Sequence, residues 1–275
     1  MTTNRHLIIQ QLDAIEAAAY CDMFAAAPVA LTSALQLRTC EMRGATLLVA
    51  PRLPTPVFNR VIGLGNTHSA STVDLDEITN IYRAAGVNTW WLHLSPGAQP
   101  DSLAAELISR RFTPPARQFW VKMLHRNTFP SPVDTTLDIR IIRASERQIF
   151  GETLCDAFEM PAPLAARFAA LAERENWHAV GAFDHDKLLG GGLLRIEGAT
   201  AWLGAGGVRP EARGHHVHRA IMALRIRLAI EAGCSVITTE TGEPMQGEPN
   251  PSLRNMLANG FEKVFSRANY ASPVA

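Results

Sequence analysis

The sequence predicts an α/β protein of the α+β type, built as two tandem domains that each carry a mixed, mostly antiparallel central sheet flanked by helices. A chain of 275 residues with 47% apolar residues can supply two compact cores of about 100–150 residues each. Apolar periodicity in the second half predicts the order β-α-α-β-β-β-α-β-α-β, and the first half echoes it. The polar, proline-containing segment 125–136 lies between a domain at residues 1–128 and a domain at residues 137–275.

The sequence of the first half predicts two helices followed by strands. Leu12 to Leu37 has apolar residues at helical intervals and is interrupted at Pro28, which predicts two helices. A helix capped by Asp74 or Asp76 and a helix that starts at Pro100 are expected further on. The strands are expected at 45–50, 57–64, 89–94 and 118–124.

The second half predicts a strand, two helices, a three-stranded meander and one long helix. Apolar residues recur at helical spacing from Val217, and Gly233 supplies a stop signal, so a helix is expected from His215 to Ala232. It has a second apolar stripe, Met222, Ile226 and Ile230, so we expect the first domain or another subunit to cover that side. The remaining strands are expected at 137–142, 178–183, 188–196, 201–208, 235–239 and 264–268, and the remaining helices at 145–158, 163–174 and 252–259.

The composition excludes several classes of partner. The formal net charge is zero and the sequence pI is about 7.1, so we expect no nucleic-acid partner and no anionic membrane partner. Asp13 and Glu16 interrupt the apolar residues near the N-terminus, which argues against a signal peptide or a membrane span there. The four cysteines form no C-x-x-C pair, as expected in a reducing compartment, so a cytoplasmic protein is predicted.

The start of the long helix has the features of an anion receptor. Pro210 cannot donate a ladder hydrogen bond and therefore ends the preceding strand near Val208, while Gly214 allows the chain to turn. The first turn of a helix exposes unpaired backbone N–H groups with partial positive charge. Arg213 and Arg219 flank this turn, so the segment is suited to a pyrophosphate.

This segment resembles motif A of the GCN5-related N-acetyltransferase (GNAT) family. Val208, Pro210, Arg213 and Gly214 stand at the family's positions, whereas His216 and His218 replace a Gly and a Gly/Ala. The resemblance implies two tandem GNAT-like domains with acetyl-CoA as cofactor of the second; the first has no Arg-x-x-Gly loop and is expected to be degenerate. The implied cofactor-binding residues here are Gly206, Gly207, Val208, Arg213, Gly214, His215, His216, Val217, His218 and Arg219.

A second resemblance lies at residues 250–261, which are similar to the family's short motif beside the pantetheine arm. It implies that Asn250, Ser252 and Asn255 also bind cofactor. A tyrosine that protonates the departing thiolate often precedes the motif's final glycine by four residues, and here that place holds Met256. Tyr270, another donor or solvent would then supply the proton, or the domain no longer catalyses.

The expected chemistry is acyl transfer, in which a general base deprotonates an amine that attacks a thioester. Four small residues at 204–207 would allow a ligand to approach the strand backbone closely, although a bulge or close packing also explains them. We take Glu240, at the end of its strand, as the candidate base and Glu197 as the second candidate; either could also be a surface or salt-bridged carboxylate.

No metal site is predicted, because His215, His216 and His218 at a helix start do not present three nitrogens to one ion. Three functions from different classes remain. The first is an acetyl-CoA-dependent N-acetyltransferase that acts on a primary amine of a small molecule or peptide. The second is a non-catalytic acyl-CoA-binding sensor, and the third is a structural dimer module, for which a homodimer is the expected assembly.

Overall fold

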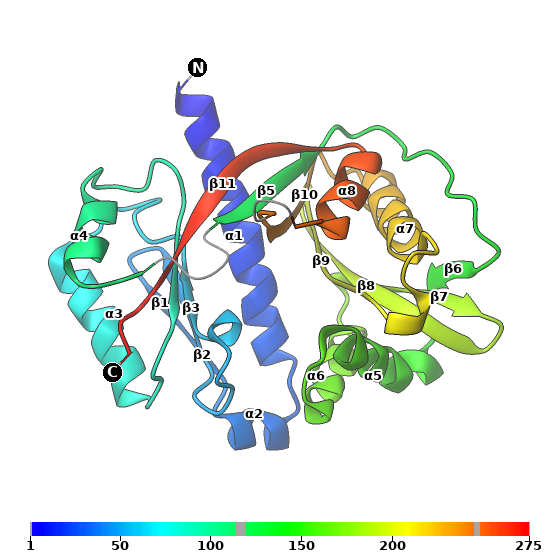
Figure 1. Cartoon of the computed structure of the whole chain (residues 1–275), viewed down its shortest axis with the longest axis horizontal. Helices are drawn as coiled ribbons and strands as arrows, with labels where there is room; N and C mark the ends of the chain where they lie inside the picture. The colour runs from blue at the N-terminus through cyan, green and yellow to red at the C-terminus, as the bar shows by residue number, and fades with distance from the viewer. Residues whose placement is uncertain (1, 114–118, 245–247, 275) are drawn as a thin grey trace.

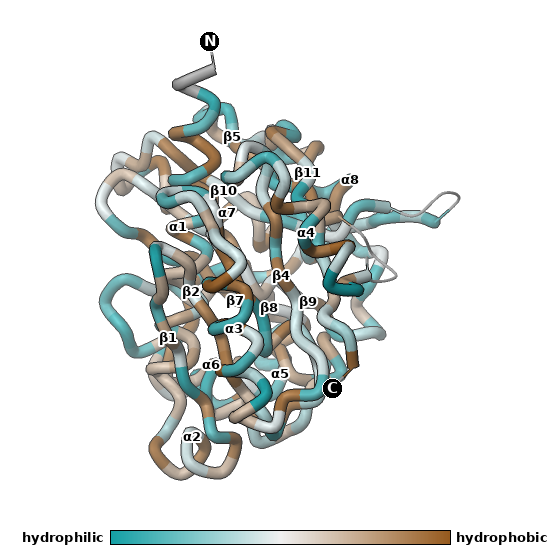
Figure 2. The backbone as a smooth tube through the Cα atoms, turned by 90° about the vertical axis from the view of Figure 1, so that its left-hand side faces the viewer, coloured by the Kyte–Doolittle hydropathy of each residue, from teal (hydrophilic) through white to brown (hydrophobic). Residues whose placement is uncertain are grey.

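The long alanine-rich segment at the start of the chain forms a helix that lies across the middle of the molecule (Figure 1). The computed structural model describes residues 2–113, 119–244 and 248–274. Helix α1 (Thr2–Ala25) is separated by Pro28 from α2 (Val29–Leu35), as predicted. Hydrophobic and hydrophilic residues are interspersed along α1 (Figure 2), and its residues Leu12, Ala19 and Met23 are buried.

No single helix in the described ranges has the length and apolarity needed to cross a membrane. Arg5–Ala25 and Val29–Leu35 meet that test only when they are taken together, and they are bent by 104° at the break between them.

The remaining elements of the first half match the prediction in type, with three corrections. The strand β1 was missed, because its residues are exposed or half-buried and lack an apolar pattern. Pro56 starts a short 3₁₀ helix, so the strand expected from residue 57 is confined to β3. Ser71, rather than Asp74 or Asp76, caps α3. The elements are β1 (Arg38–Met42), β2 (Ala45–Val49), β3 (Arg60–Ile62), α3 (Thr72–Ala84), β4 (Trp91–Leu94), α4 (Leu103–Ser109) and β5 (Phe119–His125).

The second half has every predicted helix and strand. Its long helix begins two residues later than expected, at Val217, because Pro210 starts a 3₁₀ turn and the loop then changes direction at Gly214 and His216. The elements are β6 (Asp138–Ile141), α5 (Arg147–Phe158), α6 (Ala165–Leu171), β7 (Trp177–Asp184), β8 (Lys187–Glu197), β9 (Thr200–Val208), α7 (Val217–Glu231), β10 (Val236–Gly242), α8 (Pro251–Ala258) and β11 (Phe261–Ala271).

The two expected sheets are joined into one sheet of 11 strands, in the order β1-β2-β3-β4-β11-β5-β10-β9-β8-β7-β6. The last strand of each half lies at the junction. Strand β11 inserts between β4 and β5 of the first half, and β5 inserts between β10 and β11 of the second half. Each half therefore completes the sheet of the other, and the long red strand β11 crosses from one half to the other in Figure 1.

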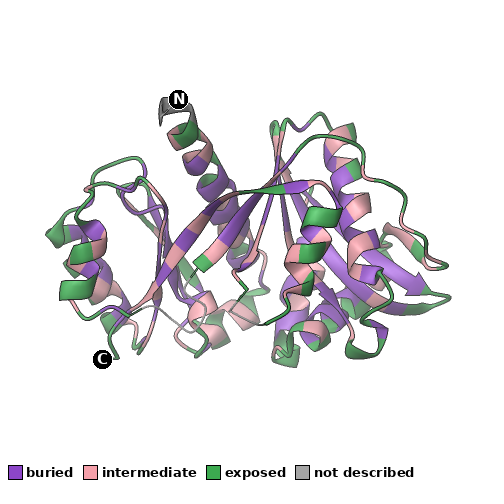
Figure 3. Cartoon of the chain, turned by 45° about the horizontal axis from the view of Figure 1, so that its top comes forward, coloured by how far each residue is buried: buried purple, intermediate pink, exposed green. Residues whose placement is uncertain are grey.

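Helices cover both faces of this sheet, and the strands between them are buried (Figure 3). Helices α1, α2, α5 and α6 contribute to a core with Trp202 of β9. On the opposite face, α3 and α4 cover the first-half strands, and α7 and α8 cover the second-half strands.

The second apolar stripe of α7 is covered, but mainly by elements of its own half rather than by the first domain. Met222 and Ile226 are 1% and 0% exposed and belong to the same core cluster as Val121 and Met123 of β5. Most of this cluster comes from β8, β9, β10, α8 and β11 of the same half, and β5 is the part of the first half that joins it.

Candidate functional site

Strands β9 and β10 separate from each other near the middle of β9. They pair in parallel only where Val236, Ile237 and Thr238 lie opposite residues 200–202. Beyond this point β9 continues to Val208, and β10 pairs instead with β5. Ala205 has a φ of 45°, and the register against β8 shifts beside it, which bends β9. The splayed strand expected at 204–208 is therefore present, and we call the place where β9 and β10 separate the splay.

The first turn of α7 lies beside the splay, since His218 approaches Gly206, and the helix has no side-chain cap. Its N-cap, His216, has a φ of 58°, and Gly214 has a φ of 87°. Within the described part of the chain, the backbone N–H groups of residues 214–219 make no hydrogen bond. These N–H groups, together with the positive end of the helix dipole, form a receptor for an anion. The left-handed geometry explains why a glycine is expected where this chain has His216.

The two arginines of this loop differ in position. Arg219 lies in the first turn of α7, and its buried Nε atom has no hydrogen-bond partner among the described residues. Arg213 is exposed and folds away from the helix, donating from Nη2 to the carbonyl oxygen of Ala157 at 3.3 Å. Arg219 is therefore better placed than Arg213 to bind an anion at this turn.

His218 lies in the first turn of α7, next to Gly206 of β9. Its Nδ1 atom is 3.2 Å from the amide nitrogen of Asn255, so Nδ1 accepts and the remaining proton is on Nε2. Burial and the nearby Arg225 guanidinium lower the pKa of His218 to about 4, while a bond to the Gly206 backbone opposes this shift. His218 is therefore a neutral donor toward β9, and Nε2 lies 3.0 Å from the point where a Gly206 Cβ would be.

Arg225 of α7 also contacts the backbone of β9, and it reaches the next strand, β8, as well. Its Nη1 atom donates to the carbonyl oxygens of Leu193 and Gly204, at 3.0 and 3.1 Å. Burial lowers the pKa of Arg225 to about 9, and no carboxylate of the described residues pairs with it. A Cβ at Gly192 would lie 2.6 Å from its Cζ, so that glycine makes room for the guanidinium. Two backbone groups of the splayed strand thus already have side-chain partners.

The residues of the second motif lie at the start of α8. Asn250 is the N-cap: its Oδ1 accepts from the N–H of Leu253 at 2.9 Å, and its Nδ2 donates to the carbonyl of Gly242 at 2.6 Å. Asn250 therefore fastens α8 to the end of β10. Ser252 is half-buried in the first turn, and Met256 is 4% exposed in the core, so no acid replaces the expected tyrosine there.

Glu240 lies on the opposite face of the sheet, under α1, and is engaged on both oxygens. Trp202 Nε1 is 3.1 Å from each oxygen, and Lys122 Nζ is 3.1 Å from Oε2. Its side chain is 5% exposed. Burial raises the pKa of Glu240, while Lys122 opposes this shift. A carboxylate in this state is a candidate base only if the structure around α1 opens, because an amine cannot reach it as it stands.

The other candidate acid–base groups, Tyr270 and Glu197, lie away from the splay. Tyr270 faces Leu92 of β4 and packs against the first-half core, on the face of the sheet opposite to Glu240. The structure therefore does not bring Tyr270 to the splay, because β11 carries it into the first half. Glu197 has a side chain that is 57% exposed and pairs with Arg195.

Helix α3 of the first half corresponds in position to α7, and a carboxylate of its own first turn already binds its N-terminus. The carboxylate of Asp74 accepts from the backbone N–H of Ser71 at 2.7 Å, and the Ser71 hydroxyl accepts from the N–H of Asp74. Arg43 pairs with Asp74 at 2.9 Å. A second anion at this helix would meet the Asp74 charge, so the first copy is physically unsuited to bind a phosphate here.

Sequence reasoning missed the charged residues that the sheet buries. Lys122 is the only charged residue within the apolar strand β5, and Arg225 interrupts the apolar face of α7. Both break an apolar pattern, which is the signal that could have identified them. Among the described residues, no group of three or more His, Cys, Asp or Glu side chains is placed to hold a metal ion.

Comparisons with known proteins agree with this geometry. Residues 145–247 match the sequence model of the acetyltransferase (GNAT) family. No curated protein sequence matches the chain.

Solved structures share its fold at low identity. A GCN5-related N-acetyltransferase from Kribbella flavida has a TM-score of 0.60 at 14% identity, covering 90% of this chain and 97% of that one. A GCN5-related N-acetyltransferase from Sphaerobacter thermophilus has a TM-score of 0.60 at 15% identity, covering 82% of this chain and 79% of that one. A tandem GNAT protein from the clavulanic acid biosynthesis pathway has a TM-score of 0.58 at 16% identity, covering 84% of this chain and 80% of that one.

Proposed function

We propose, from the membership of residues 145–247 in the acetyltransferase (GNAT) family, that this protein is an acyltransferase whose second half binds acetyl-CoA. The acceptor is a primary amine of a small molecule or peptide. A bound acetyl-CoA would supply a thioester carbonyl as the electrophile, and the chain would bind and orient it at the splayed strands.

One contrast within the molecule carries this proposal. The start of α7 has uncapped N–H groups and an unpartnered Arg219 Nε, whereas the start of α3 is closed by Ser71 and Asp74. Two helices at equivalent places in the two halves therefore differ in whether they can accept a pyrophosphate. This supports one cofactor for each chain, at α7.

Calorimetric titration with acetyl-CoA tests this assignment. Wild-type protein is expected to bind one equivalent, and Arg219→Ala is expected to bind about tenfold more weakly, a loss of about 1.4 kcal/mol. Arg83→Ala, which changes an exposed arginine at the far end of α3, is the matched control and should bind normally. Absence of binding by the wild type, or equal losses in the two variants, would refute the assignment.

A non-catalytic acyl-CoA sensor is the second candidate, and specific contacts favour it. Glu240 is held by Trp202 and Lys122 under α1, while His218 and Arg225 already contact the β9 backbone. A thiol-release assay with acetyl-CoA and a panel of amines distinguishes the two functions. Amine-dependent release of free thiol indicates a transferase, whereas tight binding without release indicates a sensor.

A further inference from the structure

The side chain of His218 touches β9 and α8 at the same time. Its Nδ1 atom accepts from the Asn255 amide of α8 at 3.2 Å, and its Nε2 atom lies 3.0 Å from the point where a Cβ of Gly206 would be. Residues 204–206 of β9 are only partly covered. The imidazole therefore stands over a part of the splayed strand that solvent still reaches.

Helix α8 is attached to β10 rather than to β9. Asn250 at its start donates to the carbonyl oxygen of Gly242, at the end of β10, at 2.6 Å. Strands β9 and β10 pair only as far as Trp202 and Thr238. The contact of His218 with Asn255 therefore connects the two sides of the splay at a level where the strands themselves no longer pair.

A ligand arm that runs from the start of α7 to the splay meets this contact on its way. The N–H groups proposed to bind a pyrophosphate are those of residues 214–219, and His218 lies within that range. Gly206 lies directly behind its ring. The family motif has a glycine or an alanine at the position of His218, and neither side chain is long enough to make this contact.

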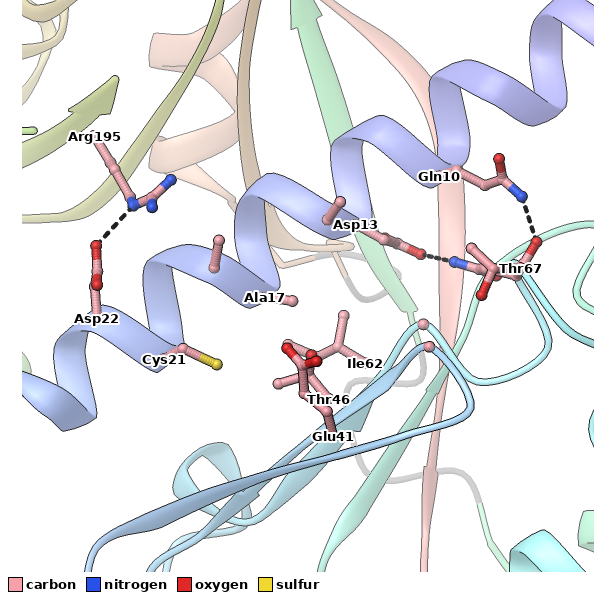
Figure 4. Close-up of a pocket in the computed structure, with 15 residues that line it drawn as sticks. Gln10, Asp13, Ala17, Cys21, Asp22, Glu41, Thr46, Ile62, Thr67 and Arg195 are labelled. Atoms are coloured by element: carbon pink, nitrogen blue, oxygen red, sulfur yellow. Dashed lines mark hydrogen bonds and ion pairs between the residues drawn. The ribbon is translucent and has the colours of Figure 1, made fainter. Parts of the chain in front are cut away.

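The contact is suited to open and close. It joins two neutral groups, because burial lowers the pKa of His218 to about 4. Figure 4 shows for comparison the ion pair of Asp22 and Arg195, at 3.0 Å, which joins α1 to β8. A neutral hydrogen bond is weaker than such a charge-assisted one. Asn259 of α8 also donates to the carbonyl oxygen of Arg219 at 3.4 Å, so the two helices stay connected when the His218 contact is broken.

We propose that His218 and Asn255 form a latch across the path of the pantetheine arm, and that an acyl-CoA binds only when the imidazole swings away from Gly206. This proposal rests on the function proposed above, since it places the diphosphate at the start of α7. A nucleoside diphosphate without an arm binds while the latch is closed. The apparent affinity for an acyl-CoA is instead reduced by the fraction of the protein in which the latch is open.

Two ligands that differ in the arm test the latch by calorimetric titration: acetyl-CoA, and ADP, which has a diphosphate but no pantetheine. His218→Ala is expected to bind acetyl-CoA about fivefold more tightly than the wild type, equivalent to about 1 kcal/mol, and to bind ADP with unchanged affinity. His218→Ser, whose side chain is also too short to reach Asn255, should behave in the same way, so the test does not depend on the folding of one variant. His178→Ala, which changes a half-buried histidine of β7, is the matched control and should bind both ligands as the wild type does.

The results separate the latch from the function on which it rests. Equal changes for the two ligands would place the effect of His218 at the diphosphate rather than at the arm. Unchanged or weaker binding of acetyl-CoA by the two His218 variants would show that this side chain does not obstruct the arm. Either result would overturn the latch and leave acetyl-CoA binding intact. Absence of acetyl-CoA binding by the wild type and by both variants would overturn the proposed function together with the latch.

Discussion

Lys122 and Glu240 come from different halves of the chain, and they face each other across the β5–β10 ladder with Nζ 3.1 Å from Oε2. Lys122 also pairs with Glu16 of α1 at 2.7 Å, and Glu16 pairs with Arg267 of β11 at 2.6 Å. All four side chains are at most 5% exposed. The exchange of the terminal strands thus brings a buried ionic network to the junction of the halves.

Removal of the central cation should destabilise the fold strongly. Lys122→Met leaves the carboxylates of Glu16 and Glu240 buried without their shared partner, and we expect the free energy of unfolding to fall by about 3–5 kcal/mol. Lys263→Met removes an ion pair with Glu243 in which the lysine side chain is 51% exposed. This change should lower the free energy of unfolding by less than about 1 kcal/mol. Urea unfolding measures both. Equal costs for the two variants would contradict the role of Lys122 in the junction.

Strand exchange should make the two halves depend on each other. We expect residues 1–130 alone to unfold without a cooperative transition, because β4 and β5 lack the β11 strand between them. Residues 131–275 alone lack β5 next to β10. Co-expression of the two pieces should restore a one-to-one complex that unfolds cooperatively. Cooperative urea unfolding of either piece alone would show that its half does not need the exchanged strand.

His218 should make the protein less stable in acid. Its pKa is about 4 when folded, below the ordinary value of 6.5, so the unfolded chain binds a proton more readily in this interval. The neutral ring contributes its full stability above pH 6.5, and about 1–3 kcal/mol is lost as the pH falls from 6.5 to 4. The free energy of unfolding, measured with urea at several pH values in this range, should depend less steeply on pH for His218→Gln than for the wild type. His185→Gln, at a side chain that is 96% exposed, should keep the wild-type slope.

Glycine at residue 216 should stabilise the loop before α7. His216 has a φ of 58°, a region that costs a residue with a side chain about 1–2 kcal/mol. After the larger chain entropy of glycine is allowed for, His216→Gly should raise the free energy of unfolding by about 0.5–1 kcal/mol. The neighbouring His215 has no positive φ, so His215→Gly should lower stability or leave it unchanged. A thermal melt of both variants measures the difference, and a destabilised His216→Gly would contradict the strain argument.

Local patterns in the sequence determined most of the elements and the uncapped start of α7. The spacing of apolar residues along α7, the proline and glycine at its start and the glycine at its end predict a helix with an open N-terminus, because these signals act within a few residues. The family resemblance around Val208–Gly214 depends on the same local residues, and the family match at 145–247 includes them. The domain boundary at residues 125–136 stays a prediction.

Tertiary structure alone decided which distant residues meet. Nothing local to β11 or β5 specifies that the two strands exchange places, since register and neighbours depend on the whole sheet. That exchange moves Tyr270 into the first half and brings Lys122 to Glu240, so it separates one candidate residue from the start of α7 and buries another. Whether a carboxylate acts as a base or as a structural ion pair depends on such neighbours, because burial and opposite charge set its protonation state.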